Sequence, residues 1–173
     1  MERFSLLGSA CKRLAWVQTE ERPRFEALVN MGNYYLQAYE KAGKADPYPF
    51  TNWAIAQLLA ARLDDTHARD WESTLPDECQ RMIEVARTRN ESEPNFWDSV
   101  AEADCEVVKL LLQGRTRGKE AEHIVELYRT AFRRGASPRE IASVHEHLDF
   151  LIALSGPWPR SVREALDAIR AAL

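Results

Sequence analysis

Apolar residues recur every three or four positions along almost the whole chain, and no stretch alternates apolar and polar residues as a half-buried strand would. Most glycines and prolines stand where this spacing is interrupted. The pattern predicts eight amphipathic helices. We expect them over about 2–18, 23–43, 50–63, 75–90, 92–114, 121–134, 138–155 and 162–173.

Several local signals mark the expected helix ends. Gly43 and the prolines of 46–49 should stop the second helix, because proline cannot continue a helix and restricts the residue before it. Gly135 should stop the sixth helix. The segments 137–140 and 161–164 both begin with serine and end with glutamate, which predicts a capping box at the start of each of the last two helices.

The connections between the expected helices are short, so neighbouring helices should be antiparallel. The chain is therefore predicted to be all-α, with its helices grouped as four hairpins over about 2–43, 48–90, 94–135 and 138–173. We expect these hairpins to stack as one helical-repeat domain spanning residues 1–173. A non-repetitive helical bundle is the alternative that the same periodicity allows.

The second helix of every hairpin carries one common pattern, in which a small or medium residue is followed after three positions by a large one and after two more by alanine. A large side chain in this place can enter the groove of a neighbouring helix, and the small residue one turn on lets the two backbones approach. The four copies are Met31, Tyr35, Ala38; Cys79, Ile83, Ala86; Ile124, Tyr128, Ala131; and Ala165, Ile169, Ala172.

Together these patterns resemble the tetratricopeptide repeat (TPR) family, which pairs a W-x2-L-G-x2-Y helix with an A-x3-F-x2-A helix. The first helix reads Phe4-x2-Leu7-Gly8-x2-Cys11, with cysteine where an aromatic residue is usual. The segment 97–104 matches less well, because it ends on the polar Asp104. The resemblance implies an α-solenoid in which Leu7 and Gly8 pack together with the large and small residues of the second helices.

Two segments resemble a narrower group within that family. The segments 47–53 (PYPFTNW) and 143–151 (SVHEHLDFL) are similar to segments of divergent bacterial TPR regions attached to signalling and caspase-like conflict proteins. The first is also similar to the TPR-like regulatory region of apoptosis-signal-regulating kinases. The family resemblance implies a partner-binding groove formed by first-helix residues, among them Lys12, Asn52 and Arg62.

The amino-acid composition argues against several classes of protein. The 173 residues are 45% hydrophobic and 29% charged, and their formal net charge of −4 argues against a whole-chain nucleic-acid binder. No apolar run is long enough to cross a membrane, and the first segment lacks the features of a secretory signal. Three scattered cysteines indicate a reducing compartment, so we expect a cytoplasmic protein without a membrane segment.

Charge is unevenly distributed along the chain. Residues 1–114 hold 13 basic and 19 acidic groups, whereas residues 115–173 hold 10 basic and 8 acidic groups. Arg129, Arg133, Arg134 and Arg139 cluster around one helix end and the next helix start. They could stabilise a helix C-terminus, or they could form a docking point for an acidic peptide or domain. The alternative function that they suggest is a helical-bundle regulator that binds an acidic ligand or nucleic acid through the arginine cluster of 129–139.

Candidate catalytic and metal-binding groups are few. Glu120 and His123 have the carboxylate–histidine spacing of di-iron bundles, but such a site needs a second copy that the sequence lacks. His145 and His147 are two positions apart and cannot converge on one metal from a helix, and His145 is better placed to pair with Asp149. We therefore expect no catalytic residue, no metal and no cofactor, and a metal-binding helical enzyme is the least favoured alternative.

The sequence thus favours a non-enzymatic interaction or scaffold module that recognises a partner protein or peptide, in bacterial signalling or defence if the narrower resemblance holds. The first and last helices are apolar and begin or end abruptly. Since a repeat buries its apolar face only against neighbours, we expect these end helices to pack on an adjoining domain of a longer parent, on a partner chain or on a second copy in a homo-oligomer.

Overall fold

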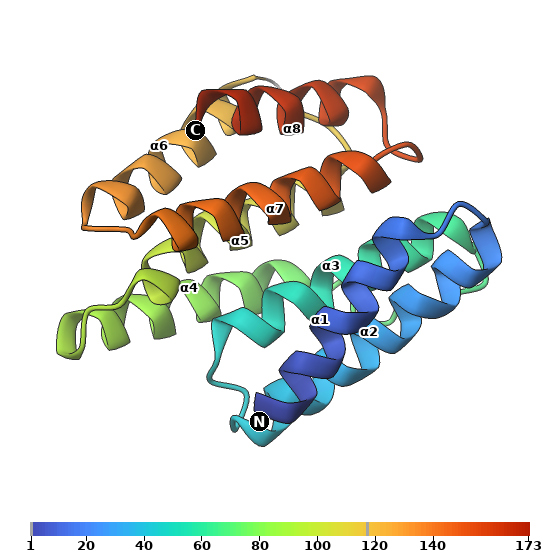
Figure 1. Cartoon of the computed structure of the whole chain (residues 1–173), viewed down its shortest axis with the longest axis horizontal. Coiled ribbons are helices and arrows are strands. Elements are labelled where there is room, and N and C mark those ends of the chain that lie inside the picture. Colours follow the sequence, from blue (N-terminus) through green and yellow to red (C-terminus); the bar gives the residue numbers. More distant parts are fainter. Residues whose placement is uncertain (1, 117) are drawn as a thin grey trace. The chain divides into compact units, whose positions relative to one another are not determined.

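The computed structural model describes residues 2–116 and 118–173, which form helices and connections without a strand (Figure 1). The predicted all-α class is therefore confirmed. The helices of the described residues are α1 (Glu2–Val17), α2 (Glu21–Lys41), α3 (Pro47–Leu63), α4 (Leu75–Ser92), α5 (Phe96–Gln113), α6 (Lys119–Arg133), α7 (Pro138–Leu154) and α8 (Arg160–Ala172).

The chain forms two compact units, residues 1–85 and 86–173, and the division between them falls inside α4. Each unit has its own set of fully buried large side chains. Tyr35, Phe50, Ile55 and Met82 are among those of the first unit, and Leu111, Tyr128, Leu148 and Phe150 among those of the second. That the whole chain acts as one domain stays a prediction.

The first unit is organised by α2, which packs against both α1 and α3 (Figure 1). Gly8 lies directly under the ring of Tyr35, because a Cβ built on Gly8 would come within 2.8 Å of that ring. The absence of a side chain at this position lets α1 and α2 approach closely. The helix α3 is buried along almost its whole length, which fits its nearly continuous apolar sequence.

The start of α3 corrects one prediction. The prolines of 46–49 were expected to end the second helix, yet α2 already ends at Lys41 and both prolines lie in the first turn of α3. Asp46 caps this helix, because its Oδ1 accepts a hydrogen bond of 3.1 Å from the backbone N–H of Tyr48. Proline is tolerated there, since first-turn N–H groups have no partner within the helix.

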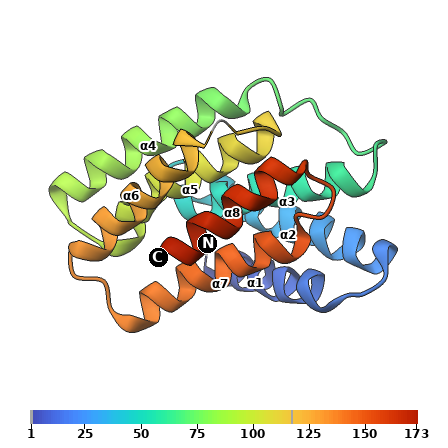
Figure 2. The ribbon, with the colours of Figure 1, turned by 90° about the horizontal axis from the view of Figure 1, so that it is seen from above.

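In the second unit α5 packs against α6, and α8 packs against both α6 and α7. Figure 2 shows α8 with α6 on one side and α7 on the other. The connection between α7 and α8 is held by Trp158, which is buried and donates from Nε1 to the Leu111 carbonyl oxygen at 2.9 Å. Across α7 and α8, Arg170 Nε donates to Asp149 Oδ1 at 2.8 Å. Asp149 thus pairs with Arg170, and its charge also acts on His145, the partner expected from the sequence.

The two predicted capping boxes have different outcomes. The box at Ser137 is confirmed, with the Ser137 side chain accepting from the Glu140 N–H and the Glu140 carboxylate accepting from the Ser137 N–H. The box at Ser161 is wrong, because Pro159 is the N-cap residue and Ser161 already lies inside the helix. Glu164 instead pairs with Arg160 one turn earlier, at 2.7 Å.

Candidate functional site

Three hydroxyl groups meet between α1 and α3. Ser9 Oγ lies 2.9 Å from Tyr35 Oη and 3.4 Å from Tyr48 Oη, and the two tyrosine oxygens are 3.3 Å apart. Burial raises the pKa of Tyr35 far above its ordinary value, with a contribution from Tyr48. The Tyr35 hydroxyl is therefore neutral and serves as a fixed hydrogen-bonding group that joins the two helices.

One turn along α1, a cation lies beside this cluster. Lys12 Nζ donates to Asn52 Oδ1 at 3.3 Å, and Asn52 Nδ2 donates to the Tyr48 carbonyl oxygen at 2.9 Å. The Asn52 side chain is buried, whereas Lys12 is half-buried and Tyr48 is exposed. Asn52 thus holds the ammonium group of Lys12 in place and is not itself presented to solvent.

An exposed aromatic residue extends the same side of α1. Ser9, Lys12 and Trp16 are spaced by three and four positions, so they project from one face of the helix. Trp16 is 37% exposed, so part of its large indole ring is available for contact with a partner. We call Ser9, Lys12, Trp16, Tyr48 and Asn52 the α1–α3 face.

The α1–α3 face combines a positive charge, two exposed or half-exposed hydroxyls and an aromatic ring within one unit. An ammonium group and hydroxyls can hydrogen-bond a carboxylate or a peptide backbone. The indole ring offers a rigid apolar contact, of the kind that dominates binding energy at protein interfaces. The arrangement suits recognition of a peptide segment, and it contains no paired acid and base.

The structure brings together two of the three predicted groove residues. Lys12 and Asn52 are hydrogen-bonded to each other, as described above. Arg62 is exposed in the last turn of α3, ten residues beyond Asn52 and therefore about 15 Å further along the helix. Arg62 thus lies outside the α1–α3 face.

The predicted arginine cluster is partly occupied by contacts within the second unit. Arg129 Nη2 donates to the Ala172 carbonyl oxygen at 2.8 Å, at the C-terminal end of α8. Arg133 pairs with Glu126 and also donates to Thr130 Oγ1 at 2.9 Å. Arg134 and Arg139 are exposed around the connection between α6 and α7. Two of the four arginines therefore have a structural role in stabilising helices, and the docking role of the cluster stays a prediction.

Most residues predicted to pack the repeats lie in the interior of the structure. Gly8, Tyr35, Ala38, Ile83, Ala86, Tyr128, Ala131 and Ile169 are all buried. Leu7 differs from them, because it is 37% exposed. Ala172 is half-buried in the last turn of α8.

Sequence reasoning missed Ser9, Trp16 and Tyr48. Their signal was the spacing of Ser9 and Trp16 from Lys12, which places all three on one helix face. Nothing in the sequence could have shown Tyr48 opposite them, since that contact joins residues 39 positions apart.

The other candidate groups form ordinary structural contacts. Glu120 Oε2 accepts from Thr116 Oγ1 at 3.3 Å in the first turn of α6. Within residues 2–116 and 118–173, no three histidine, cysteine or acidic side chains gather as metal ligands would. No helix of the described chain has the length and apolar character needed to cross a bilayer.

The comparison with known families agrees with the geometry of the first unit. Residues 1–59 match the family model described as Tetratricopeptide Repeats-Sensor. Residues 1–59 are therefore similar to the TPR family, and we call them the TPR segment. This TPR segment comprises α1, α2 and most of α3, so it contains every residue of the α1–α3 face. No curated protein and no solved structure matches the chain.

The TPR assignment explains the contact of Gly8 with Tyr35, since these are the glycine of the first-helix motif and the large residue of the second-helix motif. A related contact recurs outside the matched segment, where Tyr128 of α6 donates to Asp104 Oδ1 of α5 at 2.6 Å. The narrower resemblance to caspase-like conflict proteins stays a prediction.

Proposed function

We propose that the TPR segment is a protein-interaction module whose α1–α3 face binds an extended segment of a partner protein. The observation that carries this proposal is the hydrogen-bonded placement of Lys12 by Asn52 beside the exposed rings of Trp16 and Tyr48. An acidic residue of the partner would pair with Lys12, and an apolar residue would pack on Trp16.

The positioning of Lys12 matters for the strength of such a contact. A free lysine side chain loses much rotamer entropy when it is immobilised in a complex. Asn52 already restricts Lys12, so part of this cost is met on folding, which is how preorganisation increases affinity. The half-buried setting also weakens screening of the charge by salt.

We further propose that the chain acts without catalysis, as a cytoplasmic recognition part of a signalling system. The word "Sensor" in the family description supports this role, as does the TPR fold of the matched segment. In such a role, binding at the α1–α3 face would report the presence of the partner to whatever the chain is joined to or associates with.

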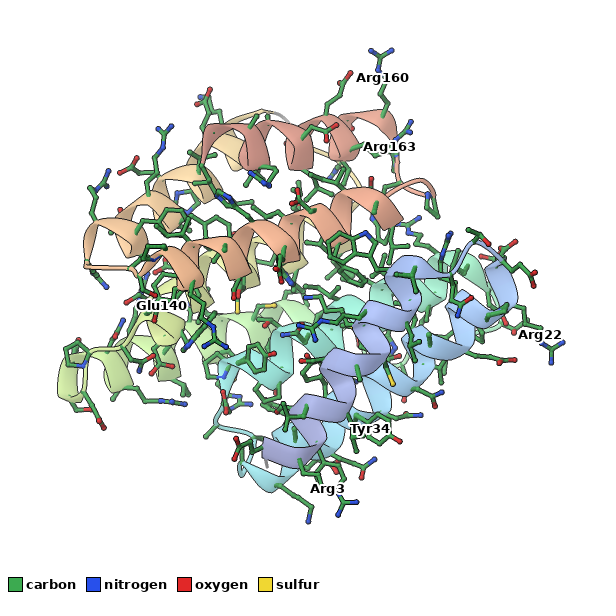
Figure 3. All side chains as sticks on the ribbon, viewed as in Figure 1. Arg3, Arg22, Tyr34, Glu140, Arg160 and Arg163 are labelled. Carbon is green, nitrogen blue, oxygen red and sulfur yellow. The ribbon has the colours of Figure 1, made fainter. Side chains whose placement is uncertain are left out.

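The experiment is affinity capture from an extract of the organism that encodes the chain, followed by calorimetric titration of the captured protein with purified chain. Lys12→Glu and Trp16→Ala should each weaken binding at least tenfold. The matched control is Arg22→Glu, because Arg22 is exposed on α2 and extends away from the first unit (Figure 3). Equal weakening by the control, or full binding by both variants, would rule the face out.

A further inference from the structure

The outer side of α1 is apolar and uncovered. Seven large hydrophobic residues are exposed in the described chain, and five of them lie on this one helix. Apart from Trp16, they are Leu6 at 65%, Leu7 at 37%, Leu14 at 51% and Val17 at 71% exposure. Isolated exposed leucines are normal at protein surfaces, but a contiguous group of them marks an interaction site.

The spacing of these residues indicates what kind of partner fits. Leu7, Ala10, Leu14 and Val17 are separated by three, four and three positions, which is the a/d spacing of a coiled coil over nearly two heptads. Such a narrow apolar stripe packs against one other helix, with the small Ala10 leaving room for a larger side chain opposite. We call Leu7, Ala10, Leu14 and Val17 the outer seam.

The outer seam is distinct from the α1–α3 face. Successive residues of a helix point about 100° apart, so the two stripes of α1 occupy different sides. The α1–α3 face is contacted by α3 through Lys12 and Ser9, whereas Ala10, Leu14 and Val17 of the seam are all exposed. A ligand on one surface therefore leaves the other open.

We propose that the outer seam binds one amphipathic helix of a partner protein, whose apolar stripe is flanked by acidic residues. The charges beside the seam support acidic flanks. Arg13 is exposed and flanks the seam beside Leu14, whereas the exposed Arg3 stands one turn before Leu7, in line with the seam, and extends from the N-terminal part of the helix in Figure 3. A glutamate of the partner at a flanking heptad position would pair with Arg13, and an acidic residue at the end of the partner's apolar stripe would pair with Arg3.

The same charges disfavour a second copy of the chain as the occupant. In a homodimer, the two α1 helices could pack antiparallel, with Leu7 against Val17 and Ala10 against Leu14. The symmetry axis of such a pair lies near residue 12. Arg13 of the two copies would then meet close to the axis. Like charges in this position destabilise the pair, whereas an acidic partner helix turns the same arginine into a favourable contact.

The last helix differs from the first in this respect. Its apolar residues Val162, Ala165, Leu166 and Ile169 are all buried, and Arg160 and Arg163 extend from its outer side (Figure 3). The expectation that both end helices present apolar surface is thus wrong for α8. The uncovered apolar stripe is a property of α1 alone among the eight helices described.

The test uses two synthetic helical peptides of about three heptads, with leucine at a and alternating alanine and leucine at d. One carries glutamate at the flanking e and g positions and the other lysine. Binding of the labelled peptides to the full chain is measured by fluorescence anisotropy. The acidic peptide should bind at least tenfold more tightly than the basic one, and Arg3→Glu/Arg13→Glu should reverse this preference.

Leu14→Glu should abolish binding of both peptides, whereas Lys12→Glu should change neither, which separates this proposal from the function of the α1–α3 face. Thermal melting followed by circular dichroism verifies that each variant folds. Failure of the acidic peptide to bind at 100 µM would overturn the proposal. Two other results would overturn it as well. One is that the chain alone forms a dimer in sedimentation velocity and that Leu14→Glu abolishes this dimer. The other is that the chain binds anionic lipid vesicles and not the peptide.

Discussion

At the scale of single residues, two buried tyrosines show how the hairpins are joined. Tyr35 and Tyr128 are completely buried, and each projects from a second helix toward the first helix of its hairpin. The hydroxyl of Tyr35 meets other hydroxyls, whereas that of Tyr128 meets the carboxylate of Asp104. Both rings are buried between the helices of their hairpin, but their hydroxyl groups have different partners.

Gly8→Ala should destabilise the protein by about 1–3 kcal/mol, because overpacking forces side chains or backbone to move. The new methyl group would lie 2.8 Å from the fully buried ring of Tyr35, which has no free space to move into. Gly156→Ala is the matched control, since nothing lies within 4 Å of its Cβ position. Urea denaturation of both variants measures the difference, and equal stability would contradict the packing of α1 on α2.

Tyr128→Phe should lower the free energy of unfolding by about 1–3 kcal/mol, and by more than Tyr35→Phe. The first change removes a 2.6 Å hydrogen bond to a carboxylate from a fully buried hydroxyl. After the second change, Ser9 and the exposed Tyr48 can still bond to each other or to water. Parallel urea titrations compare the two variants, and the reverse order would show that Asp104 does not depend on Tyr128.

His145 should make stability fall below pH 6.5. Burial lowers its pKa, Arg170 lowers it further, and Asp149 acts in the opposite direction. A histidine with a depressed folded pKa binds its proton more readily when unfolded, so its contribution to stability is complete above the unfolded value and is lost as pH falls. His145→Gln should reduce the drop in melting temperature between pH 7.5 and 5.5, and an unchanged drop would assign it to other groups.

At the scale of elements, the helix ends are held by local polar groups more often than by tertiary contacts. Asn95 caps α5 by accepting from the Asp98 N–H at 2.9 Å, and Gly114 ends the same helix in a left-handed conformation. Tertiary contacts act at the end of α8, where Arg129 of α6 reaches the Ala172 carbonyl oxygen, and in the last turn of α5, where Trp158 donates to the Leu111 carbonyl oxygen. Local capping can be predicted from sequence, whereas a cap supplied by another helix cannot.

Ser137→Ala should cost about 1 kcal/mol, because it removes the capping box of α7. Ser161→Ala is the matched control, since Ser161 lies within α8 and makes no capping bond there. Alanine is a better helix former than serine inside a helix, so the control should be neutral or slightly stabilising. Thermal unfolding of the two variants distinguishes them, and equal effects would contradict the assigned start of α8.

At the scale of the whole molecule, the chain divides into two compact units, and the boundary in the sequence falls within α4. The TPR segment and the α1–α3 face lie in the first unit, and the arginines 129–139 lie in the second. The first unit can therefore bind a partner while Arg129 and Arg133 stabilise helices of the second unit.

Trp158→Phe should loosen the second unit, because it removes the buried hydrogen bond that links the α7–α8 connection to α5. Hydrogen exchange measured by mass spectrometry should rise across 96–173 and stay unchanged in 1–74 if the units open separately. An equal rise in both regions would show instead that the chain unfolds as one domain.

The sequence by itself determined the all-α class and the approximate positions of the eight helices. These depend on local periodicity and on caps such as Ser137 with Glu140, which act over a few residues. Prediction from sequence failed where one local pattern is compatible with two structures. The prolines of 46–49, for example, can end one helix or begin the next. Ser161 failed similarly, because Pro159 starts α8 earlier than the capping motif suggests.

Only the tertiary structure decided which polar residues meet and which apolar stripe is left uncovered. Lys12 and Asn52 were candidates from the family resemblance, but their contact and the buried state of Asn52 depend on how α1 packs beside α3. Likewise α1 and α8 are both amphipathic in sequence, yet only α8 has its apolar side covered. Periodicity shows that a helix has an apolar side, but whether a neighbour covers it depends on the packing of residues far apart in the chain.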